Sequence, residues 1–167
     1  MLIEPVNGTT GGAFVPRESY LRLVSEICRS RGVLVIHDEV LTGLWRTGTP
    51  LASHHWDGCA PDIVILSKGL GAGCTGVGVV RVARTARWLR HEAADPLPAL
   101  GTMAAHPLMA AAWLGVLDEL ESIDFDVFTA RGHRLGQALK SLNGVGPVRD
   151  VRGLGFLYGV ELAPGML

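Results

Sequence analysis

Lysine and cysteine are both scarce in this sequence of 167 residues, and each shortage narrows the chemistry open to it. Only two lysines stand beside 13 arginines, so nearly every cation is a guanidinium, which cannot form an imine. The three cysteines are odd in number and show no CxxC spacing, which argues against a disulfide framework or a zinc site. The uncharged stretch at residues 69–80 holds many glycines and no helical stripe, so it does not predict a membrane span.

Neither sign of charge dominates, because the formal net charge is −1 and acids and bases are interspersed. This balance argues against the basic face of a nucleic-acid-binding protein. The first residues form neither a basic segment nor a long apolar segment, so they do not predict a signal peptide. Apolar residues make up 48% of the chain and charged residues 19%, which is typical of a folded globular protein. We therefore expect a cytoplasmic protein without nucleic-acid or membrane partners.

The hydrophobic pattern predicts an α/β fold. Leu21, Val24, Ile27 and Cys28 follow the spacing of an amphipathic helix that ends at Gly32. Apolar runs predict strands at residues 1–4, 33–36, 63–66, 77–80 and 156–162, and the middle three resemble strands buried in a parallel sheet. Helices are predicted at residues 84–91, 107–121 and 124–142. We interpret residues 1–121 as a large α/β domain and residues 122–167 as the start of a small α+β domain.

Two of the predicted strands end in ionisable residues, Asp38 and Lys68. Ligands of open α/β sheets bind at the carboxyl ends of the strands, where both residues fall. Either residue alone could simply be a charged side chain that is exposed to solvent at the end of a strand. A lysine kept at an apolar strand end in an arginine-rich chain, however, indicates chemistry that needs an amine, such as formation of an imine. A carboxylate about thirty residues earlier suits a pyridine cofactor, since it can hold the ring nitrogen protonated.

Three further features have weaker functional readings. The glycines after Lys68 lack both nucleotide-binding spacings, GxxxxGK[ST] and GxGxxG, so they more simply allow close backbone approach. Thr102 precedes a predicted helix start at His106-Pro107, where it is either a turn residue or a contact for a phosphate group. His54 and His55 lack further metal ligands in any recognisable pattern, so we predict surface or interface residues and no metal site.

An ordered series of motifs resembles one enzyme family. The series runs through Glu4-Pro5-Val6-Asn7-Gly8, Gly32 to Val40, Thr42-Gly43-Leu44-Trp45-Arg46-Thr47-Gly48, and Pro61-Asp62-Ile63 to Gly73. In both order and spacing it is similar to the class III aminotransferases, which are pyridoxal-phosphate enzymes of fold type I. The resemblance covers nearly the whole chain, and it implies that residues 1–121 are a partial cofactor-binding large domain.

The resemblance assigns roles to four residues. Lys68 would form the Schiff base with pyridoxal 5'-phosphate and carry protons during catalysis. Asp38 would pair with the pyridinium nitrogen, and Val40 would pack on one face of the ring. Thr102 would reach the cofactor phosphate, usually from a neighbouring subunit, because family members work as homodimers or larger assemblies. The implied reaction transfers an amino group from an amine or amino acid to a keto acid.

The sequence also departs from the family pattern. The family's N-terminal portion, with a phosphate loop and a stacking aromatic residue, precedes the motif at which this chain begins, so we expect a fragment. Trp45 stands where the family usually has a small residue, and Leu41 and Thr9 fill positions that are polar in some members. Two alternatives therefore stay open: an aminomutase or another class III enzyme, and a truncated chain without catalytic competence that serves as an interaction module.

Overall fold

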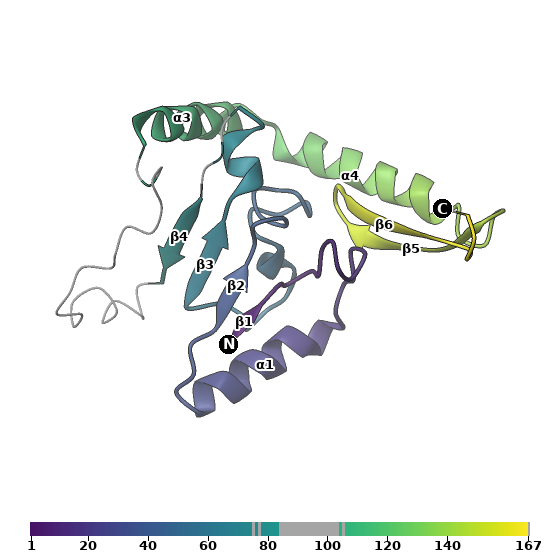
Figure 1. The fold of residues 1–167 in the computed structure, drawn as a ribbon, viewed down its shortest axis with the longest axis horizontal. Coiled ribbons are helices and arrows are strands. Elements are labelled where there is room, and N and C mark those ends of the chain that lie inside the picture. The colour runs from purple at the N-terminus through teal and green to yellow at the C-terminus, as the bar shows by residue number, and fades with distance from the viewer. Residues whose placement is uncertain (75, 77, 84–103, 105, 167) are drawn as a thin grey trace.

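The structure is a computed structural model that describes residues 1–74, 76, 78–83, 104 and 106–166 (Figure 1). Two predictions lie outside the described residues: the helix at residues 84–91 and the phosphate contact of Thr102. The chain is α/β, as the sequence predicts.

A four-stranded sheet with the order β1-β2-β3-β4 forms the N-terminal half. Its strands are β1 (Leu2–Ile3), β2 (Ile36–Asp38), β3 (Ile63–Leu66) and β4 (Val79–Val82). The first three are parallel and β4 runs antiparallel to β3, so the sheet is mostly parallel. In Figure 1 the arrowheads of β2 and β3 point toward the end of the sheet where a long helix, α3 (Pro107–Glu121), crosses. The carboxyl ends of neighbouring strands therefore meet at that edge.

Strand β2 lies further along the chain than its apolar run predicts. Residues 33–36 are the run, whereas the ladder begins only at Ile36. Val35 explains the shift, because its N–H donates to the Asp62 side chain at 2.8 Å and its carbonyl accepts from the N–H of Asp62. The apolar run thus enters the sheet through a turn held by Asp62, and the polar pair His37-Asp38 falls within the strand.

The amino terminus takes part in the sheet. The Met1 ammonium donates to the Leu34 carbonyl at 2.7 Å, and the Ile36 N–H donates to the Met1 carbonyl at 2.8 Å. The hydrogen-bond ladder between β1 and β2 therefore extends to the first residue of the chain.

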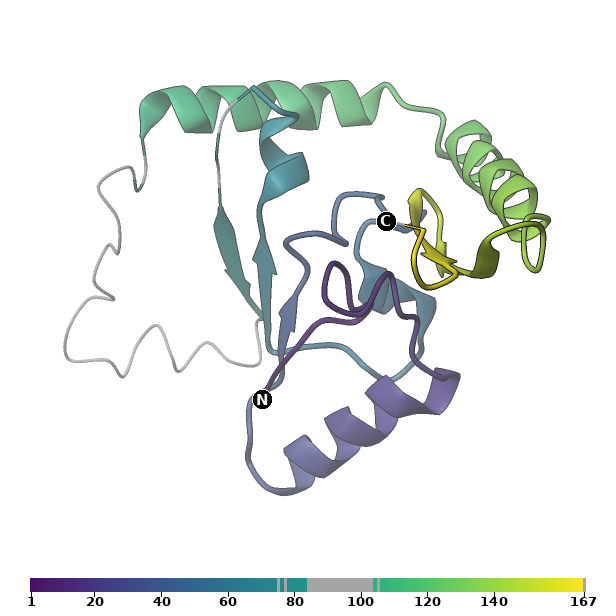
Figure 2. The same cartoon turned by 45° about the vertical axis from the view of Figure 1, so that its right-hand side comes forward.

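Helix α1 (Glu18–Ser30) runs alongside β1 in both views (Figures 1 and 2). Its buried face consists of Leu21, Ser25 and Cys28, which the helical repeat of 3.6 residues brings to one side. Beyond the helix, Gly32 adopts a φ of +64°, a left-handed conformation that glycine tolerates at a helix end. Val6, Val35 and Val64 complete a small core between this helix and the sheet.

The C-terminal third holds two helices and a hairpin. Helix α3 spans Pro107–Glu121 as predicted, and α4 spans Phe125–Lys140. Asp124 caps α4 by accepting from the N–H groups of Asp126 and Val127. Strands β5 (Val148–Leu154) and β6 (Leu157–Leu162) pair antiparallel, and α4 packs on β5. The sequence did not predict β5. The division into two domains near residue 122 stays a prediction.

The hairpin turn and α4 pack against the loop at residues 44–48. The Phe156 N–H donates to the Arg46 carbonyl at 2.9 Å. Gly155 lies so close to the backbone of Thr47 that a β-carbon would collide with it. Trp45 stacks on Phe125 of α4, with ring centroids 4.2 Å apart and planes 18° from parallel. Figure 2 shows the hairpin lying beside the loop that follows β2.

We predict that the Trp45 ring stabilises the contact with α4 although the backbone of Trp45 is in an unfavourable conformation. Its φ is +60°, which disfavours any residue with a β-carbon. Trp45→Ala removes the stack on Phe125 and should lower the free energy of unfolding by about 2–3 kcal/mol. Trp45→Gly removes the same ring but relieves the backbone, so it should be about 1 kcal/mol less destabilising than alanine. Urea unfolding of Trp45→Ala and Trp45→Gly measures the loss of the ring and the relief of the backbone. Equal stability of the two variants would contradict backbone strain at Trp45.

Candidate active site

Lys68 stands at the point where β3 ends and a short 3₁₀ turn, η2 (Lys68–Gly71), begins. Its φ is +45°, in the left-handed region that non-glycine residues seldom adopt. Leu70, two residues later, is fully buried and anchors the turn. Non-glycine residues in such conformations cluster at functional sites. The side chain of Lys68 is exposed.

Asp38 ends the neighbouring strand β2 and is half-buried. Its Oδ1 accepts a hydrogen bond from the Val40 N–H at 3.0 Å, a local turn that fixes the carboxylate against its own backbone. Asp38 pairs with Ile65 in the sheet, and Lys68 follows three residues beyond that partner. Neighbouring strands lie about 4.8 Å apart, so the fold brings the predicted carboxylate and amine to one edge of the sheet.

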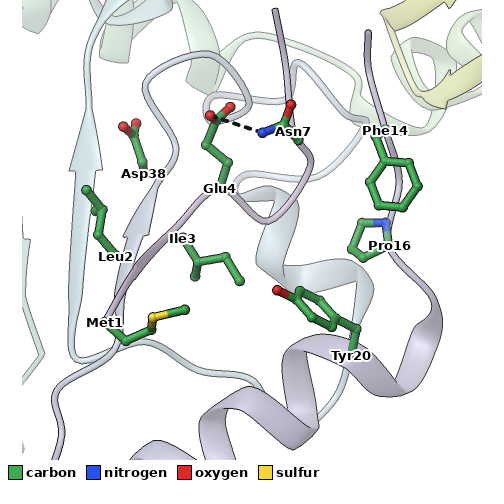
Figure 3. A pocket seen from close by; sticks show the side chains of 9 residues that line it. All are labelled: Met1, Leu2, Ile3, Glu4, Asn7, Phe14, Pro16, Tyr20 and Asp38. Carbon is green, nitrogen blue, oxygen red and sulfur yellow. Dashed lines mark hydrogen bonds between the residues drawn. The ribbon is translucent and has the colours of Figure 1, made fainter. Parts of the chain in front are cut away.

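The two candidate residues line different pockets. Asp38 belongs to a pocket of about 460 Å³ between β1 and α1. Figure 3 shows Asp38 and Glu4 at one end of it and the Tyr20 ring at the other. Glu4 is held in place because its carboxylate accepts from the Gly8 N–H at 2.9 Å and from the Asn7 amide at 3.4 Å. The remaining lining residues are Met1, Leu2, Ile3, Phe14 and Pro16.

Lys68 lines a second pocket of about 290 Å³. Leu41, Leu44 and Arg46 come from the loop after β2, while Phe156 and Leu157 come from the hairpin turn. The amine therefore faces a space that both halves of the chain enclose. Arg46, which is exposed, adds a guanidinium to the same space and could hold an anionic group near the amine.

Glu39, beside Asp38, has a role that the sequence did not reveal. Its side chain is 1% exposed. One oxygen, Oε2, accepts from the Thr42 hydroxyl at 2.8 Å and from the Ala52 N–H at 2.7 Å. The other, Oε1, accepts from the Ser53 N–H at 2.9 Å. Ala52 and Ser53 begin the 3₁₀ helix η1 (Ala52–His55), so Glu39 ties that helix to the end of β2 and shapes the loop that lines the Lys68 pocket.

His37 lies within the sheet between Ile36 and Asp38. It is fully buried, and neither ring nitrogen has a hydrogen-bond partner among the described residues. Burial lowers the pKa of His37, and the smaller influence of the Glu39 carboxylate opposes that shift. The ring is therefore held neutral at neutral pH, and we assign it to the packing of the sheet.

The other predicted residues are placed as follows. Val40 is half-buried directly after Asp38 and Glu39, and its place in the pocket walls stays a prediction. His54 and His55 are both exposed, as expected for a surface pair. No group of three histidine, cysteine or acidic side chains among the described residues is arranged to hold a metal ion. In the same part of the chain, no helix is long and apolar enough to cross a membrane.

Comparison with known proteins identifies the family. The family model described as aminotransferase class-III matches residues 1–166. The chain belongs to the class III aminotransferases. Among the relatives of this class III chain, the omega-aminotransferase of Caulobacter vibrioides is 34% identical over 168 residues, covering 98% of this chain and 38% of its own. The ornithine aminotransferase of Bacillus subtilis is 34% identical over 164 residues, covering 96% and 39%.

Solved structures agree with this membership. The (S)-enantioselective omega-transaminase of Thermomicrobium roseum superposes with a TM-score of 0.87 at 34% identity, covering 98% of this chain and 36% of that one. The ornithine aminotransferase of Toxoplasma gondii, whose structure has pyridoxal phosphate at partial occupancy in the active site, gives a TM-score of 0.78 at 34% identity, covering 96% of this chain and 37% of that one. The fold is therefore that of the pyridoxal-phosphate aminotransferases of fold type I. The class III chain spans somewhat over a third of the length of these relatives.

Proposed function

We propose that this chain carries the reactive lysine of a pyridoxal-phosphate-dependent aminotransferase, which transfers an amino group from an amine or amino acid to a keto acid. The carrying observation is the placement of Lys68 and Asp38 at neighbouring strand ends within a member of the class III family. We assign this activity to the whole protein. The chain described here matches somewhat over a third of the length of typical relatives.

Lys68 and Asp38 line different pockets, but they lie at neighbouring strand ends and their chemistry suits two contacts of the cofactor. The exposed amine of Lys68 is the group that condenses with an aldehyde, and the carboxylate of Asp38 suits a protonated pyridine nitrogen. Pyridoxal phosphate supplies the aldehyde and an electron-withdrawing ring when it is bound. Val40 and Thr102 are the proposed contacts for the ring face and the phosphate.

In this proposal Lys68 has two tasks. Its amine would first hold the cofactor covalently, and it would later move a proton from the α-carbon of the substrate to the carbon of the cofactor that carried the aldehyde. The second task needs a free and mobile side chain, and the exposed position at a tight turn provides it. Asp38 has a fixed task, and its hydrogen bond to the Val40 N–H keeps the carboxylate in one orientation.

The homodimer is part of the proposal, as is a cytoplasmic location. Helix α3 supports an assembly because none of its residues is buried, although most of them are apolar. Leu108 and Leu114 are 68% and 60% exposed. An apolar helix left uncovered in this way is typical of an interface. Cys28 and Cys59 are buried free thiols, which suits a reducing compartment.

A second candidate reaction uses the same residues. One relative, the leucine/methionine racemase of Thermococcus litoralis, is 36% identical over 170 residues. Racemases and aminomutases return the amino group to the substrate, whereas an aminotransferase leaves it on the cofactor. The formation of pyridoxamine phosphate from an amino donor by the whole protein would therefore support the aminotransferase over both alternatives.

Reductive trapping on the chain itself tests the proposal. The 167-residue chain is mixed with pyridoxal phosphate, reduced with borohydride, digested and mapped by mass spectrometry. The chain offers three amines, namely Lys68, Lys140 and the Met1 terminus, and the terminus is engaged with the Leu34 carbonyl. We expect the label on Lys68 well before Lys140. Equal labelling of the two lysines, or none, would sink the proposal and favour a chain that serves only as an interaction module.

A further inference from the structure

A third pocket, of about 400 Å³, lies between α4, the loop at residues 47–55 and the β5–β6 hairpin. Its volume falls in the range of small-molecule sites. No aspartate or glutamate is among its lining residues. The side chains that line it and carry hydrogen-bond donors are Thr47, Thr49, His55, Thr129, His133, Gln137, Lys140 and Tyr158.

Helix α4 builds one wall of this pocket with a polar stripe. Thr129, His133 and Lys140 are spaced by four and seven residues, so they share one helical face. Lys140 is one of only two lysines in the chain and forms no ion pair with any described residue. A cation left unpaired over a pocket without acidic groups gives that pocket a positive potential.

The hairpin contributes the hydroxyl group of Tyr158 to the lining of the pocket. The Tyr158 phenol lies so close to Gly136 of α4 that a β-carbon there would collide with its oxygen. Burial raises the pKa of Tyr158, so the phenol keeps its proton at neutral pH and remains a donor. Glycine at position 136 thus allows a phenolic donor to stand beside the cationic stripe.

The loop at residues 47–55 contributes the hydroxyl group of Thr47 to the pocket. Thr47 is 1% exposed, and its Oγ1 has no hydrogen-bond partner among the described residues. The Thr47 carbonyl meets the Nε2 of His55 at 3.0 Å, which holds that ring at the pocket. Buried hydroxyls are seldom left unpaired, and an unpaired one calls for a partner that the described chain does not supply.

We propose that this pocket is a second binding site, separate from the Lys68 pocket, for a small oxyanion of the phosphate or carboxylate class. The two pockets lie on opposite sides of the hairpin turn. Leu154 and Gly155 line the oxyanion pocket, whereas the next two residues, Phe156 and Leu157, line the Lys68 pocket. Lys140 supplies the charge, His133 and Tyr158 supply donors, and the absence of a lining carboxylate removes the main source of repulsion.

Calorimetric titration of the 167-residue chain with inorganic phosphate, and separately with succinate, tests this site. We expect saturable binding below about 10 mM of at least one anion, and the two arms distinguish phosphate from carboxylate ligands. Lys140→Gln should weaken that binding about tenfold, and Lys140→Gln with His133→Gln should weaken it further. All of these positions are exposed, so the variants should fold.

Two controls make the result decisive. Arg134→Gln removes a cation from the same helix but outside the pocket lining, and it should leave binding unchanged. Lys68→Ala should also leave it unchanged, although the same variant would lose covalent capture of pyridoxal phosphate. Loss of anion binding in Lys68→Ala would place the anion in the other pocket. That outcome, unaltered binding in Lys140→Gln, or no binding to the unaltered chain would each overturn the oxyanion site.

Discussion

We expect Lys68→Ala to lose the rapid covalent capture of pyridoxal phosphate by this chain and Lys140→Ala to keep it. This is the expected result if the amine at the end of β3 is the reactive one. Both variants remove a single exposed lysine, and neither residue forms an ion pair with a described partner, so their effects on folding should be alike and small. The difference between them then reports chemistry at one position.

Lys68→Arg sharpens the same test. Arginine keeps the positive charge that would attract the cofactor phosphate, but its guanidinium does not form an imine. We expect Lys68→Arg to lose the borohydride-stable label and the visible absorbance that pyridoxal phosphate gains on binding an amine, as completely as alanine does. Persistent label in the arginine variant, mapped to Lys140 or to Met1, would show that charge alone had recruited the cofactor and that Lys68 was not the site.

The second large effect concerns stability and falls on Glu39. Glu39→Ala leaves three buried donors, the Thr42 hydroxyl and the N–H groups of Ala52 and Ser53, without their acceptor. An unsatisfied buried donor costs about 1–3 kcal/mol, so we expect the free energy of unfolding to fall by about 3–5 kcal/mol. Glu39→Gln keeps one acceptor oxygen and should lie between this value and the unaltered chain.

Urea unfolding followed by circular dichroism measures this loss. Glu26→Ala is the matched control, because Glu26 is exposed on α1 and its loss should change stability by less than about 0.5 kcal/mol. If the urea midpoint of Glu39→Ala matched that of Glu26→Ala, the carboxylate would not hold η1. If Glu39→Ala disrupts the Lys68 pocket while the sheet stays folded, labelling of Lys68 by pyridoxal phosphate should already be reduced at urea concentrations that do not unfold the chain.

The elements that carry their own local signal could be predicted from the sequence. Strand β3 coincides with an apolar run, and α3 begins at Pro107 and ends at Glu121, as its pattern predicts. Strand β5 escaped prediction because its alternation is masked by charged residues. Arg152 pairs with Asp150 at 2.7 Å and with Glu161 of β6 at 2.9 Å, so the charges stabilise the hairpin only once it has formed.

The candidate site shows the same division. Asp38 and Lys68 lie at one edge of the sheet. The sequence made this predictable because an ionisable residue closely follows each of the two apolar runs. The pockets depend on residues far apart in the chain that line one space, such as Lys68 and Phe156, and no local pattern encodes this arrangement. Glu39 was overlooked for a related reason, because two of its three partners, Ala52 and Ser53, lie 13 and 14 residues downstream at the start of η1.

The hydrogen bonds of Met1 have a practical consequence for these experiments. The ammonium group and carbonyl of Met1 both bond to the segment that leads into β2, so the first residue occupies a structural position. A tag that extended the chain before Met1 would replace this ammonium group with a peptide N–H, at a residue that lines the same pocket as Asp38. The labelling and binding experiments are therefore best done without a tag at that position.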